Sequence, residues 1–149
     1  YKRITGMVAI CEDLPELHNT VTLDHELTDA DGIPAPKITY TLSQNSRDML
    51  NFAVDRATEV LEAAGAREIM SDVPLAIGGW HLMGTARMGT DPETSVVNEW
   101  GRSHDVNNLF VVDGSIFVTS AGVNPTRTIQ ALALYIADQM KQRLANLFD

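Results

Sequence analysis

The chain has 149 residues, 44% of them hydrophobic and 21% charged, which is typical of a soluble globular domain. A formal net charge of -9 argues against a nucleic-acid partner, because neutralising phosphates requires clustered Lys and Arg. No apolar run approaches the ~20 residues that a membrane-spanning helix needs. The single cysteine, Cys11, excludes an internal disulfide, and its apolar surroundings predict an inert thiol.

The first part of the chain predicts strands separated by turns. Residues 6–11 form an apolar run rich in Val and Ile, which favours a strand, and residues 21–23 predict a second, short one. The sequence Asp-Ala-Asp-Gly at 29–32 indicates a turn, since it does not have the Gly and Glu spacing of a calcium-binding loop. Residues 37–42 alternate polar and apolar side chains, as a half-buried strand does.

Residues 43–64 predict an amphipathic helix. Ser43, Asn45 or Ser46 can cap its start, and Gly65 supplies the left-handed residue that ends it. The apolar positions recur at helical spacing, at Met49, Leu50, Ala53, Ala57, Val60, Leu61 and Ala64. We assign this helix a structural role.

A boundary is expected at 71–79, and the part that follows predicts a strand, a glycine-containing loop and a long helix. Residues 109–113 form a continuous apolar run that ends in an acid, which is common in a buried parallel strand. The helix is expected over 125–147, with Asn124 fitting the cap and Pro125 the first helical position. Its buried face is predicted to contain Ile129, Leu132, Ala133, Ile136, Met140 and Leu144.

Taken one at a time, the polar residues of the second half are ambiguous. His81 beside a tryptophan is more often a hydrogen-bonded structural residue than a catalytic one. Gly84 and Gly89 have phosphate-loop spacing, but the Lys and Ser or Thr of a P-loop do not follow. Ser115 does not lie in a Gly-x-Ser-x-Gly elbow. The four histidines show no paired zinc spacing, so we predict no metal site.

Four motifs occur in order along the second half. They are HLMGTARMG at 81–89, SVVN at 95–98, NLFVVDGS at 108–115 and Asn-Pro-Thr at 124–126. As a set they resemble the carboxy-terminal signature of the glucose-methanol-choline (GMC) oxidoreductases. The segments 14–27 and 32–36 resemble the family's substrate-domain sheet, so the resemblance covers almost the whole chain. The Asn-Pro-Thr ending is similar to that of sugar-oxidising members and choline oxidase, where Asn takes the place of a second His.

The resemblance implies an FAD-dependent enzyme that oxidises a CH–OH group of a sugar or alcohol by hydride transfer to flavin N5. His81 matches the family's base, or would hold the alkoxide once it has formed. Histidine suits this role because it exchanges a proton near neutral pH. Asn124 would contact the substrate oxygen without carrying charge. We favour this role over helix capping, because one side chain cannot easily do both.

The resemblance also implies contacts with the cofactor. Reduced flavin carries negative charge, which the amino terminus of the helix at Pro125 would face, with Asn124 and Thr126 beside it. Asp113 and Gly114 would lie along the ribityl or phosphate side, where Gly permits close backbone approach. The family's Gly-x-Gly-x-x-Gly motif for the ADP part of FAD is absent here. We therefore expect this chain alone to bind FAD weakly and to be inactive.

The implied fold is α+β. Residues 1–75 would form part of a GMC-type substrate-binding sheet with a covering helix. Residues 76–149 would supply the carboxy-terminal strand and long helix of the FAD-binding α/β domain. The expected partners are the sugar or alcohol, the amino-terminal part of the same protein, and an electron acceptor that is oxygen, a quinone or a cytochrome. Uncovered apolar surface predicts self-association as a homo-oligomer.

Two other functions compete with this interpretation. One is a non-catalytic structural or interaction domain that keeps the same scaffold. The other is a small hydrolase that uses His81 and Ser115, and esterase activity of this chain alone would favour it. The sequence starts at Tyr1 without a recognisable targeting segment, as expected for a piece of a longer chain, and leaves a cytoplasmic or periplasmic location open.

Overall fold

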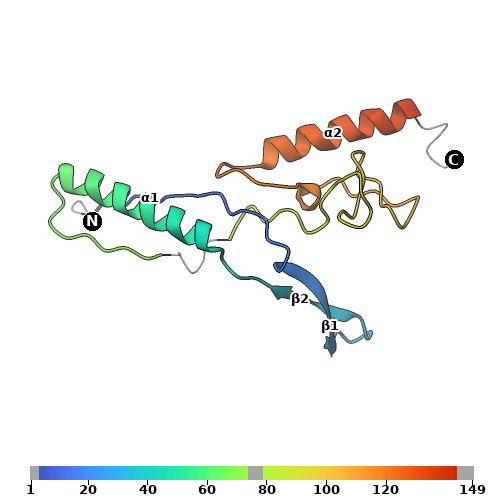
Figure 1. Ribbon diagram of the computed structural model, residues 1–149, viewed down its shortest axis with the longest axis horizontal. Coiled ribbons are helices and arrows are strands. Elements are labelled where there is room, and N and C mark those ends of the chain that lie inside the picture. Colours follow the sequence, from blue (N-terminus) through green and yellow to red (C-terminus); the bar gives the residue numbers. More distant parts are fainter. Residues whose placement is uncertain (1–3, 74–78, 144–149) are drawn as a thin grey trace.

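The chain forms an elongated α+β structure, which confirms the predicted fold class (Figure 1). The computed structural model describes residues 4–73 and 79–143. Its elements are strands β1 (Thr20–Thr28) and β2 (Pro34–Thr39), helix α1 (Gln44–Ala63), the short 3-10 helix η1 (Gly114–Ile116) and helix α2 (Thr126–Arg143). In Figure 1, α1 and α2 lie toward opposite ends, and the hairpin of β1 and β2 projects from the region between them.

The hairpin confirms the strands expected at 21–23 and 37–42, with different bounds. β1 and β2 form a two-stranded antiparallel sheet in which Val21 lies opposite Ile38. β1 is longer than expected, while β2 begins earlier and ends at Thr39. Both side chains of the Val21 and Ile38 pair remain exposed, so the hairpin does not bury its own apolar face.

The turn between the strands lies where the sequence indicates it, at 29–32. The Asp29 carboxylate accepts hydrogen bonds from Asp31 N and Ile33 N, both at 2.9 Å. Gly32 follows with a φ of 81°, a left-handed conformation that costs glycine little. The aspartate is therefore a turn former, as its sequence context predicts.

Helix α1 also follows its sequence signals. Ser43 is the N-cap, and its hydroxyl accepts from Ser46 N at 3.1 Å. Gly65, with a φ of 87°, donates its N–H to Glu62 O at 2.9 Å and ends the helix. In Figure 1, α1 extends away from the hairpin, so within the described residues it does not cover the sheet as expected.

The strand predicted at 6–11 is wrong, because this segment pairs with no strand among the described residues. It is an extended segment that leads to Asp13, whose carboxylate accepts hydrogen bonds from the hydroxyls of Tyr40 and Ser46. The Cys11 thiol lies 4.0 Å from Met49 O on α1. Partial burial, followed by the hydrogen bond and the negative charge of Asp13, raises the pKa of Tyr40 to about 12.

The core of the second half lies between loops and α2. Its fully buried side chains are Val97, Ile116 and Ile136, one from a loop, one from η1 and one from α2. The loops are joined by short backbone contacts, including Gly89 N to Val97 O at 2.8 Å. Trp100 packs on Tyr135 of α2, with ring centroids 6.1 Å apart. This small core fixes the position of α2 over the loops.

The buried parallel strand predicted at 109–113 is also wrong for the described residues. The segment is half-buried or exposed, and it makes an isolated antiparallel bridge from Phe110 to Arg102. Val111 N donates to Gly101 O at 2.8 Å, so the run pairs locally with the preceding turn. An apolar run in a sequence indicates burial but does not show which segment covers it. Within the described residues, the segment at 109–113 has no parallel strand beside it.

Helix α2 matches the long helix that the sequence predicts, and its predicted face turns toward the core. Ile136 is fully buried, and Leu132 and Met140 pack against it. Pro125 lies just before the first helical residue, where its carbonyl accepts from Ile129 N at 2.9 Å. The predicted end at 147, with Leu144, falls outside the described residues.

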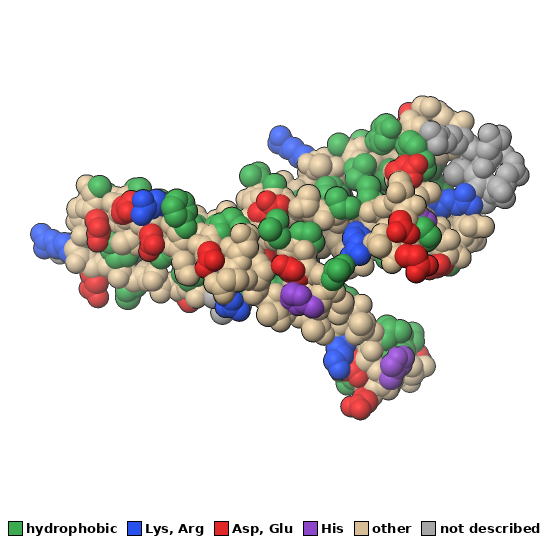
Figure 2. Space-filling model, in the orientation of Figure 1, with side chains coloured by type: hydrophobic (Ala, Val, Ile, Leu, Met, Phe, Trp, Pro, Cys, Tyr) green, Lys and Arg blue, Asp and Glu red, His purple; other side chains and the backbone are tan. Residues whose placement is uncertain are grey.

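The molecule exposes far more surface than a compact protein of its size. Its accessible area is 11751 Å², whereas a folded monomer of 16.3 kDa exposes about 7,500 Å². Figure 2 shows hydrophobic side chains along the visible face of both halves. Exposed large side chains include Val8, Leu23, Ile38, Phe52, Leu82 and Leu134. Self-association through this surface stays a prediction. Among the described residues, neither helix has the length and hydropathy to cross a bilayer.

Candidate catalytic site

The segment that follows His81 runs alongside η1 and is held there by backbone hydrogen bonds. Gly84 N donates to Gly114 O at 3.3 Å and Ala86 N to Ser115 O at 2.9 Å. Gly84 has a φ of 88°, and a Cβ added to it would lie 3.1 Å from Phe117 O. The close backbone approach therefore requires glycine at this position. The backbone hydrogen bonds of Gly84 and Ala86 thus hold the 81–89 motif beside the 108–115 motif.

Gly114 is the point where the 81–89 motif, the 108–115 motif and helix α2 come close together. A Cβ added to it would lie 3.2 Å from Cδ1 of Ile129, in the first turns of α2. The same atom would lie 3.4 Å from Cγ of Met83 and 3.7 Å from Leu82 O. The residue after His81, the end of the 108–115 motif and the start of α2 thus lie within van der Waals contact. Met83 and Ile129 account for the glycine, and its closeness to a cofactor stays a prediction.

His81 has an unusual backbone conformation. Its φ is 64°, the only positive value among the non-glycine residues that the structure describes. Left-handed backbone costs such a residue about 1–2 kcal/mol, so this conformation is strained. The imidazole is exposed, between Trp80 at 72% exposure and Leu82 at 80%. An exposed and conformationally constrained imidazole can meet a substrate from outside this chain.

Asn124 and Thr126 are exposed at the start of α2, and Pro125 between them is half-buried. The first intrahelical bond at this end runs from Ile129 N to Pro125 O. The amides of the first turn, from Thr126 onward, consequently have no acceptor within the helix. An exposed helix terminus with unused N–H groups attracts negative charge. The substrate role of Asn124 and its convergence with His81 stay predictions.

Asp113 is the N-cap of η1, and its carboxylate is held by Ser115. Its carboxylate accepts from the Ser115 hydroxyl at 2.6 Å and from Ser115 N at 2.8 Å. The hydroxyl first, and then the backbone N–H, hold the pKa of Asp113 below its ordinary value. Because Ser115 donates its only hydroxyl proton to Asp113, it is engaged in a structural bond. This weakens the hydrolase alternative that pairs Ser115 with His81.

The Asp113 contact predicts a small pH dependence of stability. Because the pKa of Asp113 is lower in the folded than in the unfolded state, the ionised carboxylate stabilises the fold above about pH 4. This stabilisation is lost as the pH falls through the folded-state pKa. We expect Asp113→Asn, which keeps an acceptor for Ser115 N, to flatten the decline of the urea midpoint between pH 5 and pH 3. Asp91→Asn is the matched control, and an equal change in both variants would contradict this origin.

His104 forms a contact that the sequence did not indicate. Its Nε2 lies 2.9 Å from the Ser95 hydroxyl and 3.2 Å from Gly89 O. The Ser95 hydroxyl donates to Asp91 O at 2.6 Å, and a carbonyl only accepts, so Nε2 of His104 carries a proton. This histidine joins the ends of the loop at 89–95 and has a structural role. Its partner lies nine residues away in an irregular loop, which no periodic pattern reveals.

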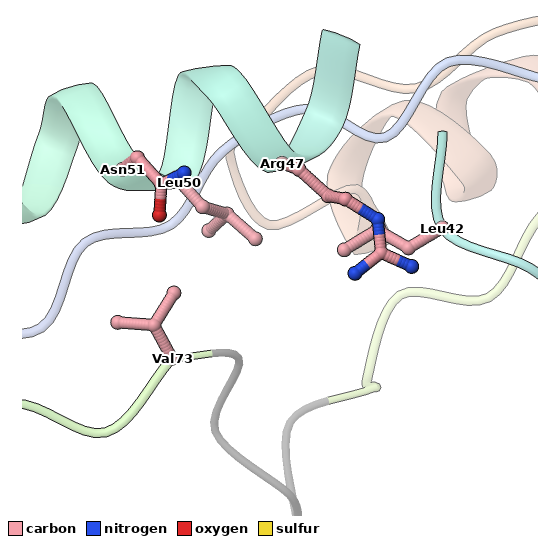
Figure 3. A pocket seen from close by; sticks show the side chains of 5 residues that line it. All are labelled: Leu42, Arg47, Leu50, Asn51 and Val73. Atoms are coloured by element: carbon pink, nitrogen blue, oxygen red, sulfur yellow. The ribbon is translucent and has the colours of Figure 1, made fainter. Parts of the chain in front are cut away.

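A shallow cavity lies elsewhere, at the start of α1. It has a volume of about 120 Å³ and is lined by Leu42, Arg47, Leu50, Asn51 and Val73. Figure 3 shows Leu50 and Arg47 reaching from α1 toward the space that Val73 borders from the opposite side. None of the motif residues lines it, so we assign it no part in the site. Among the described residues, no cluster of His, Cys, Asp or Glu side chains is arranged to hold a metal ion.

The α+β fold and the match to a family model show that the chain is the carboxy-terminal portion of a GMC-type oxidoreductase. The chain matches the GMC oxidoreductase family over residues 15–133 and belongs to that family. The matched region includes every motif residue of the candidate site.

Several relatives are oxidoreductases of bacteria. The chain is 43% identical over 143 residues to 2-methyl-1,2-propanediol dehydrogenase of Mycolicibacterium austroafricanum, covering 93% of this chain and 25% of that protein. It is 44% identical over 137 residues to 6'''-hydroxyparomomycin C oxidase of Streptomyces lividus, covering 91% of this chain and 25% of that protein. It is 37% identical over 127 residues to the fructose dehydrogenase large subunit of Gluconobacter japonicus, covering 85% and 23%. The chain therefore spans about a quarter of the length of these relatives.

A solved structure supports the fold. The crystal structure of pyridoxine 4-oxidase from Mesorbium loti superposes with a TM-score of 0.66 at 23% identity. The similarity covers 87% of this chain and 28% of the other. At this identity the match bears on the fold alone.

Proposed function

We propose that the protein containing this chain is an FAD-dependent oxidoreductase that oxidises a CH–OH group of a sugar or alcohol to a carbonyl. The observation that carries the proposal is the contact at Gly114, where Met83 and Ile129 both lie within 3.4 Å of the position a Cβ would take. This contact supports the proposal, because Met83 lies two positions after His81 and Ile129 five positions after Asn124. The named relatives include a propanediol dehydrogenase, a fructose dehydrogenase and a hydroxyparomomycin oxidase, which supports this substrate class.

In this proposal His81 takes the proton of the substrate hydroxyl. The exposed imidazole is the proton-exchanging side chain of the motif, and its left-handed backbone fixes the direction in which it leaves the chain. The Asn124 amide donates a hydrogen bond to the same substrate oxygen and orients it toward His81. The oxygen loses its proton to His81 while the carbon loses hydride, which leaves a neutral carbonyl compound.

The residues at the start of α2 fit a flavin. When bound, FAD would accept the hydride from the substrate carbon. The first-turn amides near Thr126, which have no acceptor within the helix, and the positive helix terminus offer donors to a ring system that gains negative charge, with Pro125 and Asn124 beside them. Asp113 and Gly114 would contact the ribityl or phosphate side. We infer that most of the cofactor contacts come from outside these 149 residues.

This proposal gives the two halves of the chain different roles. Residues 1–75 would belong to the substrate-binding part, and residues 76–149 to the FAD-binding part with His81 and Asn124. The electron acceptor would be oxygen, a quinone or a cytochrome. The exposed surface of 11751 Å² supports a large contact with another part of the protein.

The test is anaerobic reduction of the flavin in the full-length protein. We expect a panel of sugars, diols and primary alcohols to contain compounds that bleach the oxidised flavin absorbance, with a stoichiometric carbonyl product. A protein that binds FAD and is reduced by dithionite, but by no member of the panel, would contradict the proposed function. Readmitting oxygen or a quinone then identifies the acceptor.

A further inference from the structure

The segment at 10–13 contacts both halves of the molecule. On one side, Asp13 binds Ser46 at 2.7 Å and also Tyr40, and the Cys11 thiol faces Met49 O at 4.0 Å. On the other side, Glu12 accepts a hydrogen bond from the Thr119 hydroxyl at 2.9 Å. Glu12 and Thr119 are 107 positions apart in the sequence.

A second contact joins the same two segments close to the first. A Cβ added to Gly122 would lie 3.1 Å from Ile10 O and 3.6 Å from Glu12 N. Gly122 therefore lets the loop approach the backbone of the extended segment more closely than an alanine would. Thr119 and Gly122 lie on the same loop, so the extended segment supports it at two points.

The supported loop is the one that ends at Asn124. It leaves η1 at Phe117 and reaches α2 at Thr126 without regular secondary structure between them. Its apolar residues Val118 and Val123 are 52% and 75% exposed, so they anchor it weakly. Phe117 packs against the core, but no side chain of residues 118–125 is fully buried, so the conformation of this loop depends on contacts such as these.

We propose that Glu12, Thr119 and Gly122 are positioning residues that fix the Asn124 loop. Glu12 and Thr119 form a hydrogen bond, which we call the clamp. Gly122 lets the loop lie close enough to the segment at 10–13 for this bond to form. Asn124 follows Gly122 by two positions, so a shift of the clamp moves the amide relative to His81. The catalytic consequence rests on the proposed function, whereas the fixing of the loop is a property of the chain itself.

The structural arm of the test uses hydrogen–deuterium exchange of the full-length protein without substrate. Thr119→Val and Glu12→Ala each remove the clamp, and we expect amide exchange over 117–125 to rise about 3- to 10-fold. Glu12→Gln keeps an oxygen that accepts from Thr119 and should exchange like the unchanged protein. Ser120→Ala is the matched control, because among residues 4–73 and 79–143 the Ser120 hydroxyl bonds only to the neighbouring Ala121 O.

The catalytic arm measures steady-state rates of the same variants with FAD bound. We expect Thr119→Val, Glu12→Ala and Gly122→Ala to lower kcat/KM about 3- to 10-fold with an unchanged pH profile, since the proton-accepting group is intact. Glu12→Gln should restore the rate. Exchange and rates indistinguishable from Ser120→Ala would overturn the proposal. Raised amide exchange with unchanged rates would overturn only the catalytic consequence of the clamp. If the protein without substitutions is itself inactive, the proposed function is wrong, and the exchange data still show whether the clamp fixes the loop.

Discussion

Replacing His81 with alanine in the full-length, FAD-loaded protein is expected to lower kcat for alcohol oxidation by about 10²- to 10⁴-fold, the usual contribution of a general base. The imidazole is exposed and lies on the motif that contacts Gly114 through Met83. Without it, the substrate hydroxyl must lose its proton to water. The measurement is the anaerobic rate of flavin bleaching, which reports the redox step without the later reaction of the acceptor.

His25→Ala is the matched control for this experiment. His25 is an exposed histidine of β1, far from the motif segments in the sequence, and its loss should leave the rate unchanged. The flavin absorbance of His81→Ala must remain, since His81 is not needed to retain the cofactor in this proposal. A bleaching rate equal to that of the unchanged protein would remove His81 from the mechanism.

The local elements of the fold could be predicted because their signals lie within the elements. Ser43 and Gly65 mark the ends of α1, and the observed helix, Gln44–Ala63, differs from the expected 43–64 by one residue at each end. The turn at 29–32 was likewise indicated by its own residues. The failures, at 6–11 and 109–113, are apolar runs whose state depends on a partner. The sequence shows that such runs favour burial, but it does not show what covers them.

The candidate site could be predicted in part for the same reason. The motifs gave the residue types, and two of them lie beside each other at Gly114, while one shared site with Asn124 stays a prediction. The left-handed backbone of His81 could not be foreseen, because a non-glycine residue gives no local signal for it. The bond between Glu12 and Thr119 was also missed. Its two partners are 107 positions apart, and neither has a pattern that points to the other.

The largest effect on stability is expected at Gly101, where the turn of the second half is tightest. Gly101 has a φ of 69°, and a Cβ added to it would overlap the carbonyl oxygen of Val111. The two residues are held together, because Val111 N donates to Gly101 O at 2.8 Å. Gly101→Ala therefore combines left-handed strain with a backbone clash, and should lower the free energy of unfolding by about 2–5 kcal/mol. Urea unfolding of the full-length protein measures this loss.

Gly32→Ala separates the two contributions. Gly32 has a φ of 81°, similar to Gly101, but beyond its two chain neighbours no atom of the described residues lies within 4 Å of the Cβ position. It should therefore lose only the conformational part, about 1–2 kcal/mol. If the free energy of unfolding falls equally in the two variants, the Val111 carbonyl moves aside without an energetic penalty. The tight packing of this turn is then not the reason for glycine at position 101. A larger loss at Gly101 would show that the close contact with the Val111 carbonyl, and not the left-handed backbone alone, requires glycine in this turn.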